Sequence, residues 1–126
     1  MARILLIDDE ELVRAVLRIL LEGEGHEVIE AANGRKGVAR QNEIPCDLVI
    51  TDIVMPDMEG IETIIQLKRS NPDVKIIAIS GGGRTGNTEY LVQAQKLGAD
   101  KGLEKPFSNA ELIASVEELL ARPPDC

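Results

Sequence analysis

The amino-acid sequence predicts an α/β fold, a doubly wound parallel sheet of five strands with helices on both faces. Two observations lead to this prediction. Short, buried-looking apolar runs recur along the 126 residues, and they alternate with stretches of helical periodicity. Such β/α alternation is typical of a parallel sheet covered by helices. The chain has no repeat, low-complexity tract or linker, so we expect one domain over residues 1–126.

The first two β/α units occupy the N-terminal third of the chain. The apolar run Ile4–Ile7 predicts a strand, and residues 10–24 carry valines and leucines at helical spacing. Two nearby glycines are expected to end this helix. Residues 26–31 alternate weakly and predict a second strand. An Asn-Gly pair at 33–34 then predicts a turn and cap, followed by a short polar helix to about Glu43.

The middle units follow the same order. Leu48–Asp52 predicts the third strand, and a helix with apolar residues at helical spacing is expected to begin at Gly60. An Asn-Pro pair at 71–72 is expected to stop that helix. Ile76–Ile79 predicts the fourth strand, which leads into a glycine-rich loop. A helix is expected over about residues 88–97.

The last unit is the shortest. Gly102–Glu104 predicts a brief fifth strand. Ser108 and Glu111 have the spacing of a capping box, which predicts the start of the final helix. Leucines and a valine share one face of that helix, and the Pro-Pro pair at 123–124 is expected to terminate it.

Polar residues with chemical potential stand where the apolar runs end: Asp8, Asp9, Asp52, Ser80 and Lys105. An acid before a helix is often only a cap, and a lysine is usually a solvated surface charge. The carboxyl ends of parallel strands, however, share one edge of the sheet, where ligands bind. We therefore expect these five side chains to converge.

The mutual repulsion of three converging carboxylates has to be compensated. Two carboxylates about 4 Å apart repel by about 4 kcal/mol at an effective dielectric near 20, and capping does not offset that. Either pKa values rise or a hard cation binds, and oxygen ligands without His or Cys favour Mg²⁺. Lys105 is expected to pair with Asp52, and the Ser80 hydroxyl to donate to a phosphoryl oxygen. The combination predicts phosphoryl transfer with an aspartate nucleophile.

The composition argues against some classes of binding partner and indicates the cellular compartment. The net charge of −8 and the pI near 4.7 argue against direct binding of nucleic acid or an anionic membrane. Cys46 and Cys126 lack metal or redox spacing and suit a reducing compartment. The apolar run after the N-terminus is too short for a signal sequence or a membrane span. We therefore expect a cytoplasmic protein.

Taken together, Asp8-Asp9, the run from Asp52 to Gly60, Ser80 and the Lys105-Pro106-Phe107 triplet resemble the receiver domains of two-component response regulators. The resemblance covers essentially the whole chain, and the motifs are specific in combination. It implies a flavodoxin-like sheet in the order 2-1-3-4-5. It also implies that Mg²⁺ is bound by Asp9, Asp52 and the backbone carbonyl of Val54, with Asp8 acting mainly through a water ligand.

By the same resemblance, Asp52 is the phosphoacceptor, and Ser80 and Lys105 contact the incoming phosphoryl group. The donor would be a sensor histidine kinase or a histidine phosphotransfer protein, and phosphorylation would switch the binding of an output target. The chain would not be an enzyme in the usual sense, since it would catalyse only its own phosphorylation and dephosphorylation. It ends soon after the last predicted helix, so no output domain is expected in it.

Two features depart from the family pattern. Gly102 stands three positions before Lys105, where receivers usually carry an aromatic or similar switch residue. The stretch after Ser80 is about three residues longer than is typical and begins with three glycines. We therefore expect activation to proceed through ordering of the 81–88 loop, which contains Arg84, rather than through rotation of a ring.

Three other functions compete with this interpretation. Residues 81–88 nearly spell a nucleotide-binding P-loop, but Asn87 stands in place of its lysine. A flavodoxin-type electron carrier would share the fold class, yet four acids follow the first strand where a flavin phosphate would bind. The third alternative is a receiver that acts as a phosphorylation-independent interaction module. The presence of all five site residues favours an active receiver over that module.

Overall fold

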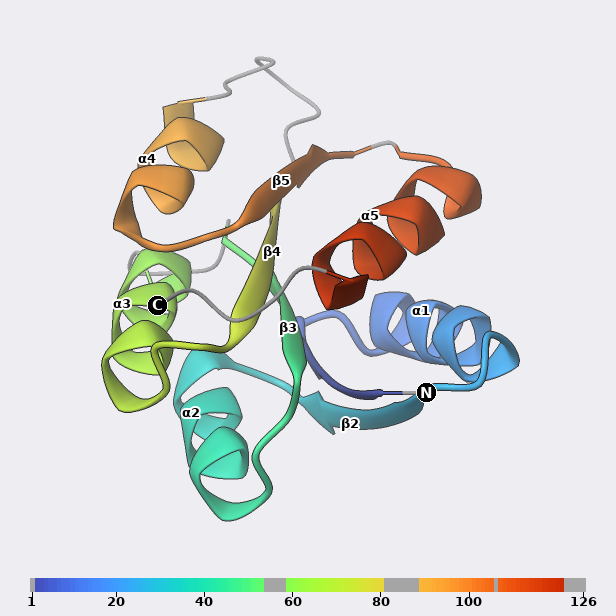
Figure 1. The fold of residues 1–126 in the computed structure, drawn as a ribbon, viewed down its shortest axis with the longest axis horizontal. Coiled ribbons are helices and arrows are strands. Elements are labelled where there is room, and N and C mark those ends of the chain that lie inside the picture. Colours follow the sequence, from blue (N-terminus) through green and yellow to red (C-terminus); the bar gives the residue numbers. More distant parts are fainter. Residues whose placement is uncertain (1, 54–58, 81–88, 106, 122–126) are drawn as a thin grey trace.

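A computed structural model describes residues 2–53, 59–80, 89–105 and 107–121. Five parallel strands form one sheet in the order β2-β1-β3-β4-β5, which confirms the predicted topology. Helices α1 and α5 lie on one side of this sheet, and α2, α3 and α4 lie on the other (Figure 1). Within the described residues, no helix is long and apolar enough to cross a membrane.

The observed elements begin and end within about two residues of the predicted ones. The strands are β1 (Arg3–Ile7), β2 (Glu27–Ala31), β3 (Leu48–Asp52), β4 (Lys75–Ser80) and β5 (Lys101–Glu104). The helices are α1 (Glu11–Gly23), α2 (Gly34–Glu43), α3 (Glu59–Ser70), α4 (Glu89–Leu97) and α5 (Asn109–Ala121).

The core has two layers because successive side chains of a strand point to opposite faces. On one face, Leu5 and Ile7 of β1 pack with residues of α3 and α4. On the other face, Ile4 and Leu6 pack with residues of α1 and α5. Strands β3 and β4 are buried along their whole length. This explains why their sequences read as continuous apolar runs rather than as alternating ones.

Local signals in the sequence set the helix starts. The Asn33 side chain accepts a hydrogen bond from the Lys36 backbone N–H at 2.9 Å, so the predicted cap of α2 is present. Both bonds of the predicted capping box form at α5. The Glu111 N–H donates to the Ser108 hydroxyl at 3.0 Å, and the Ser108 N–H donates to the Glu111 carboxylate at 3.2 Å.

The register of the sheet brings the strand ends level. Ile7 of β1 pairs with Thr51 of β3, which leaves Asp8 beside Asp52. The next strand along, β4, ends at Ser80, and its neighbour β5 ends at the residue before Lys105. The sheet thus places its polar strand ends along one edge.

Candidate functional site

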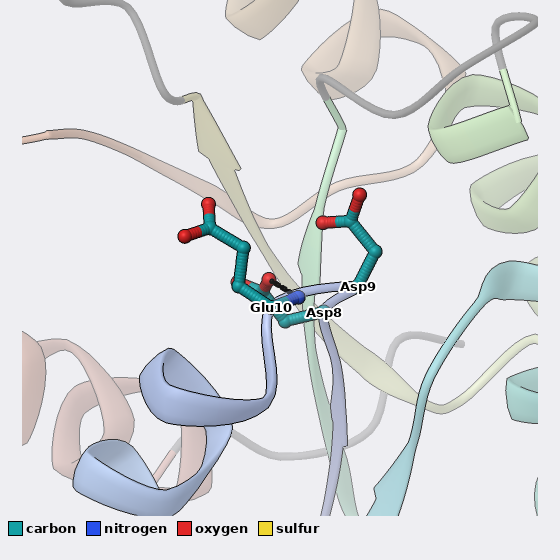
Figure 2. A group of neighbouring side chains, drawn as sticks. All are labelled: Asp8, Asp9 and Glu10. Atoms are coloured by element: carbon teal, nitrogen blue, oxygen red, sulfur yellow. Dashed lines mark hydrogen bonds between the residues drawn. The ribbon is translucent and has the colours of Figure 1, made fainter.

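The turn after β1 carries three consecutive acids, Asp8, Asp9 and Glu10. One oxygen of each lies within 4.8 Å of the other two, and Figure 2 shows the three side chains leaving the same turn. Asp8 is only 1% exposed, whereas Asp9 and Glu10 are exposed. Asp8 accepts a hydrogen bond from the Glu10 backbone N–H at 2.8 Å, drawn as the dashed line in Figure 2. Glu10 was not among the predicted site residues, although it directly follows the two that were.

Burial dominates the protonation of Asp8. Loss of solvent raises the pKa of the Asp8 carboxyl above its usual value, and the charges of Asp9 and Glu10 act in the same direction. The hydrogen bond from the Glu10 backbone and the Lys105 ammonium lower the pKa, but they do not cancel the effect of burial.

Lys105 lies between the two buried acids. Its Nζ is 3.6 Å from Oδ2 of Asp52 and 3.9 Å from Oδ2 of Asp8. Asp52 is 4% exposed and Ser80 is 1% exposed, while the Lys105 side chain keeps about a quarter of its surface in solvent. The Lys105 backbone N–H donates to the Ser80 carbonyl at 2.9 Å, so β4 and β5 continue to pair up to the site. One ammonium thus serves two carboxylates.

Ile53, the residue directly after β3, is hydrogen-bonded to the sheet and lies close to the start of α3. The Ile53 N–H donates to the Ile79 carbonyl at 2.9 Å. A Cβ on Gly60 would lie 2.3 Å from the Ile53 Cα, so only glycine lets the start of α3 approach this closely. The predicted Val54 carbonyl ligand lies outside the described residues. The same holds for the 81–88 loop and for Pro106.

A hydrogen-bonded network of Arg14, Arg18 and Glu30 contacts the main chain of the acidic turn, and it was not predicted. Arg14 of α1 donates from Nη1 to the Asp8 carbonyl at 2.7 Å and from Nε to Glu30 of β2 at 3.1 Å. Glu30 also accepts from Arg18 at 2.7 Å. The hydrogen bond from Arg18, followed by that from Arg14, keeps the pKa of the Glu30 carboxyl below its usual value despite partial burial.

The donor set fits a hard divalent cation. The side chains that the structure brings together offer carboxylate oxygens, the ligands that Mg²⁺ prefers. A bound cation would also compensate the buried charge of Asp8, whose pKa is raised mainly by burial. Asp8, Asp9 and Glu10 form the group of neighbouring carboxylates, and the register places Asp52 beside Asp8.

Comparison with known proteins places this geometry in context. Residues 4–117 match the model of the response regulator receiver domain. The chain is 33% identical to the chemotaxis protein CheY of Thermotoga maritima, over 93% of this chain and 96% of that protein. It is 37% identical to the transcriptional regulatory protein ResD of Bacillus subtilis, over 95% of this chain but only 48% of that protein.

Solved structures agree with the sequence comparisons. The crystal structure of a CheY-like receiver domain protein from Methanospirillum hungatei superposes with a TM-score of 0.85 at 32% identity. The match covers 95% of this chain and 94% of that one. A receiver domain protein from Clostridium thermocellum superposes with a TM-score of 0.84 at 31% identity, over 95% of this chain and 94% of that one.

Proposed function

Because this chain belongs to the response regulator receiver domain family, whose members are phosphoacceptor switches of two-component systems, we propose that Asp52 is its phosphoacceptor. Asp52 takes a phosphoryl group from a phosphohistidine in a reaction that depends on Mg²⁺. The observation that carries the proposal is the Lys105 ammonium, which lies within 4 Å of both Asp52 and Asp8 at the carboxyl edge of the sheet. An acid, a lysine and an acidic turn at this edge are the parts that phosphoryl transfer needs.

The reaction is a single displacement. A carboxylate oxygen of Asp52 forms a bond to phosphorus as the bond from phosphorus to the donor's imidazole nitrogen breaks. The electron pair stays on that nitrogen, which takes up a proton, and the product is an acyl phosphate. Asp8, Asp9, Asp52 and the Val54 carbonyl would hold a divalent cation, which would supply positive charge to the phosphoryl group.

The remaining residues position the phosphoryl group and neutralise its charge. Before transfer, the Lys105 ammonium neutralises the charge of the Asp52 carboxylate. As the acyl phosphate forms, the same ammonium contacts a phosphoryl oxygen instead. The Ser80 hydroxyl, at the end of the neighbouring strand, donates to another phosphoryl oxygen. The chain turns over no separate substrate and catalyses only its own phosphorylation and dephosphorylation. The acyl phosphate then changes the affinity for an output target.

The donor is proposed to be a sensor histidine kinase or a histidine phosphotransfer protein that docks on α1. Three large apolar side chains lie one helical turn apart on the outer face of this helix. Leu12, Val16 and Ile19 are 81%, 60% and 72% exposed. Contiguous exposed apolar surface marks interaction sites. This face begins immediately after the acidic turn, so a helix packed on it would hold its histidine near Asp52.

Labelling with acetyl phosphate tests the assignment. The wild-type protein with Mg²⁺ is expected to gain one phosphoryl group, detected by intact-mass spectrometry and released by hydroxylamine. The Asp52→Asn variant should gain none. Asp73→Asn is the matched control, because it removes an exposed acid at the opposite edge of the sheet. Labelling that persists in Asp52→Asn, or that is unchanged in excess EDTA, would contradict the proposal.

A further inference from the structure

Arg14 joins three elements beneath the acidic turn. It belongs to α1, contacts the main chain directly after β1, and is bound by Glu30 at the end of β2. Its side chain is only 14% exposed. Such a buried guanidinium must be paired, and it uses Nε for the carboxylate and Nη1 for the Asp8 carbonyl. The side chain is therefore held in one orientation.

Glu30 is the residue that fixes this orientation. Its Oε1 accepts from Arg14, and its Oε2 accepts from Nη1 of Arg18 at 2.7 Å. The guanidinium is a rigid planar fork, so a carboxylate on one edge determines where the remaining N–H groups point. With Nε bound to Glu30, Nη1 is directed at the Asp8 carbonyl.

The Asp8 main chain is consequently held from both ends. Its N–H donates to the Ala31 carbonyl at 3.2 Å, and its carbonyl accepts from Arg14 at 2.7 Å. That carbonyl belongs to the peptide that links Asp8 to Asp9, so its orientation sets where the two carboxylates stand relative to each other. Groups that orient metal ligands in this way commonly change metal affinity by about 10–100-fold when they are removed.

We propose that Arg14, held by Glu30, is a positioning residue for the divalent cation that the acidic turn binds. The inference rests on the proposed function, since it takes Asp8 and Asp9 as ligands. Arg14 touches neither the cation nor the phosphoryl group. It acts by fixing the Asp8–Asp9 peptide in the geometry that binding requires, so that the acids need not reorganise against their mutual repulsion.

The direction in which Arg14→Met changes the Mg²⁺ affinity distinguishes a positioning effect from a purely electrostatic one. Arg14 is positive and lies next to the acidic turn, so its charge alone repels a cation. If charge were its only effect, Arg14→Met would bind Mg²⁺ more tightly than the wild type. If positioning dominates, Arg14→Met binds Mg²⁺ more weakly. The two accounts therefore predict opposite changes in the same measured constant.

The experiment is calorimetric titration of the full chain with Mg²⁺ alone. Arg14→Met is expected to weaken binding by about tenfold. Arg18→Met is the matched control, because it removes the same charge and another bond to Glu30 but no contact with Asp8. Its affinity should be unchanged or slightly tighter. In the metal-free protein, exchange of the Glu10 amide proton should be faster in Arg14→Met only, since its acceptor Asp8 is no longer held.

Glu30→Gln extends the test without removing the guanidinium. This variant should also bind Mg²⁺ more weakly, and adding it to Arg14→Met should cause no further loss, since both residues act through one contact. An equal loss from Glu30→Gln in both backgrounds would overturn the proposal, and so would unchanged or tighter binding by Arg14→Met. Failure of the wild type to bind Mg²⁺ would instead contradict the proposed function itself.

Discussion

At the scale of single residues, Asp8 is the acid that shapes the site. It is almost fully buried, and the ammonium nearest to it also serves Asp52. One positive charge facing two buried carboxylates, with two exposed acids beside them, leaves the turn electronegative. Burial, reinforced by the charges of Asp9 and Glu10, raises the pKa of Asp8. A divalent cation would compensate the charge of Asp8 at neutral pH.

Asp8→Asn is expected to stabilise the metal-free protein at neutral pH. The pKa of Asp8 is higher in the folded than in the unfolded chain. Asp8 therefore contributes favourably to the free energy of unfolding at a pH below its ordinary pKa of 3.8, and this contribution is lost as the pH rises through its pKa in the folded chain. The neutral amide avoids that loss. Urea unfolding in EDTA at about pH 7 should show a gain of about 0.5–3 kcal/mol in the free energy of unfolding.

The gain should disappear as the pH falls below about 4, where Asp8 is protonated in both states. Asp73→Asn removes an exposed acid and should show no such dependence. A gain for Asp8→Asn that is constant across the pH range would mean that its charge is not the cause.

Sequence reasoning predicted the inner residues of the site but not the outer ones. Asp8 and Lys105 directly follow a strand and Asp52 is the last residue of one, so all three could be placed because the ends of parallel strands share one edge. Arg14 and Glu30 meet across two elements that are far apart in sequence. Their contact depends on how α1 is rotated on the sheet, and periodicity does not specify rotation closely enough to pair two side chains.

At the scale of elements, α1 is amphipathic in an unusual way. Leu17 and Leu21 are buried against the sheet, yet the opposite face is also apolar, with Leu12, Val16 and Ile19 exposed. A helix that only covers the core needs one apolar stripe, and its outer face is normally polar. The second stripe is therefore better explained by a partner than by folding.

Ile19→Glu is expected to slow phosphotransfer from a protein donor by about tenfold, the usual effect of removing an apolar anchor from an interface. Labelling by acetyl phosphate should be unchanged, since a small donor needs no docking surface. The measurement compares both rates, using any sensor kinase or phosphotransfer protein that phosphorylates the wild type.

Val92→Glu on α4 is the matched control for this test, because it also adds one negative charge at an exposed apolar position. It should leave both rates unchanged. Equal slowing of the two donors by Ile19→Glu would point to a disturbed site rather than to lost docking.

The elements themselves were largely predictable, for a reason visible in β3 and β4. Both are buried on two faces, so they contain unbroken apolar runs, Leu48–Ile50 in β3 and Ile76–Ile79 in β4. Close approaches between elements were not predictable. Gly37 of α2 is an example, because a Cβ there would lie 2.3 Å from the Ile7 side chain. Its sequence neighbours give no sign of that contact.

At the scale of the whole molecule, the proposed cation site would be linked to the stability of the fold. A ligand that binds only the folded chain adds about 2.7 kcal/mol to the free energy of unfolding when its concentration is 100 times its dissociation constant. We expect Mg²⁺ to raise the urea midpoint of the wild type relative to EDTA. Asp9→Asn should lose most of this increase, since it removes a proposed ligand at an exposed position.

The comparison is made at one Mg²⁺ concentration with the ionic strength held constant by NaCl. An equal shift in the wild type and in Asp9→Asn would indicate general screening of the net charge of −8 rather than binding at the acidic turn.

The order of the strands has a consequence for synthesis of the protein. Asp8 and Asp52 are made early, whereas Lys105, their shared ion-pair partner, follows the last strand to be translated and joins the edge of the sheet through β4. A chain that ends before Lys105 contains two acids whose burial is costly, and it lacks the ammonium group that pairs with them. If Asp52 is the phosphoacceptor as proposed, we expect a chain to become competent for phosphorylation only after Lys105 has been synthesised. A nascent copy that lacks Lys105 would then take no phosphoryl groups from the donor.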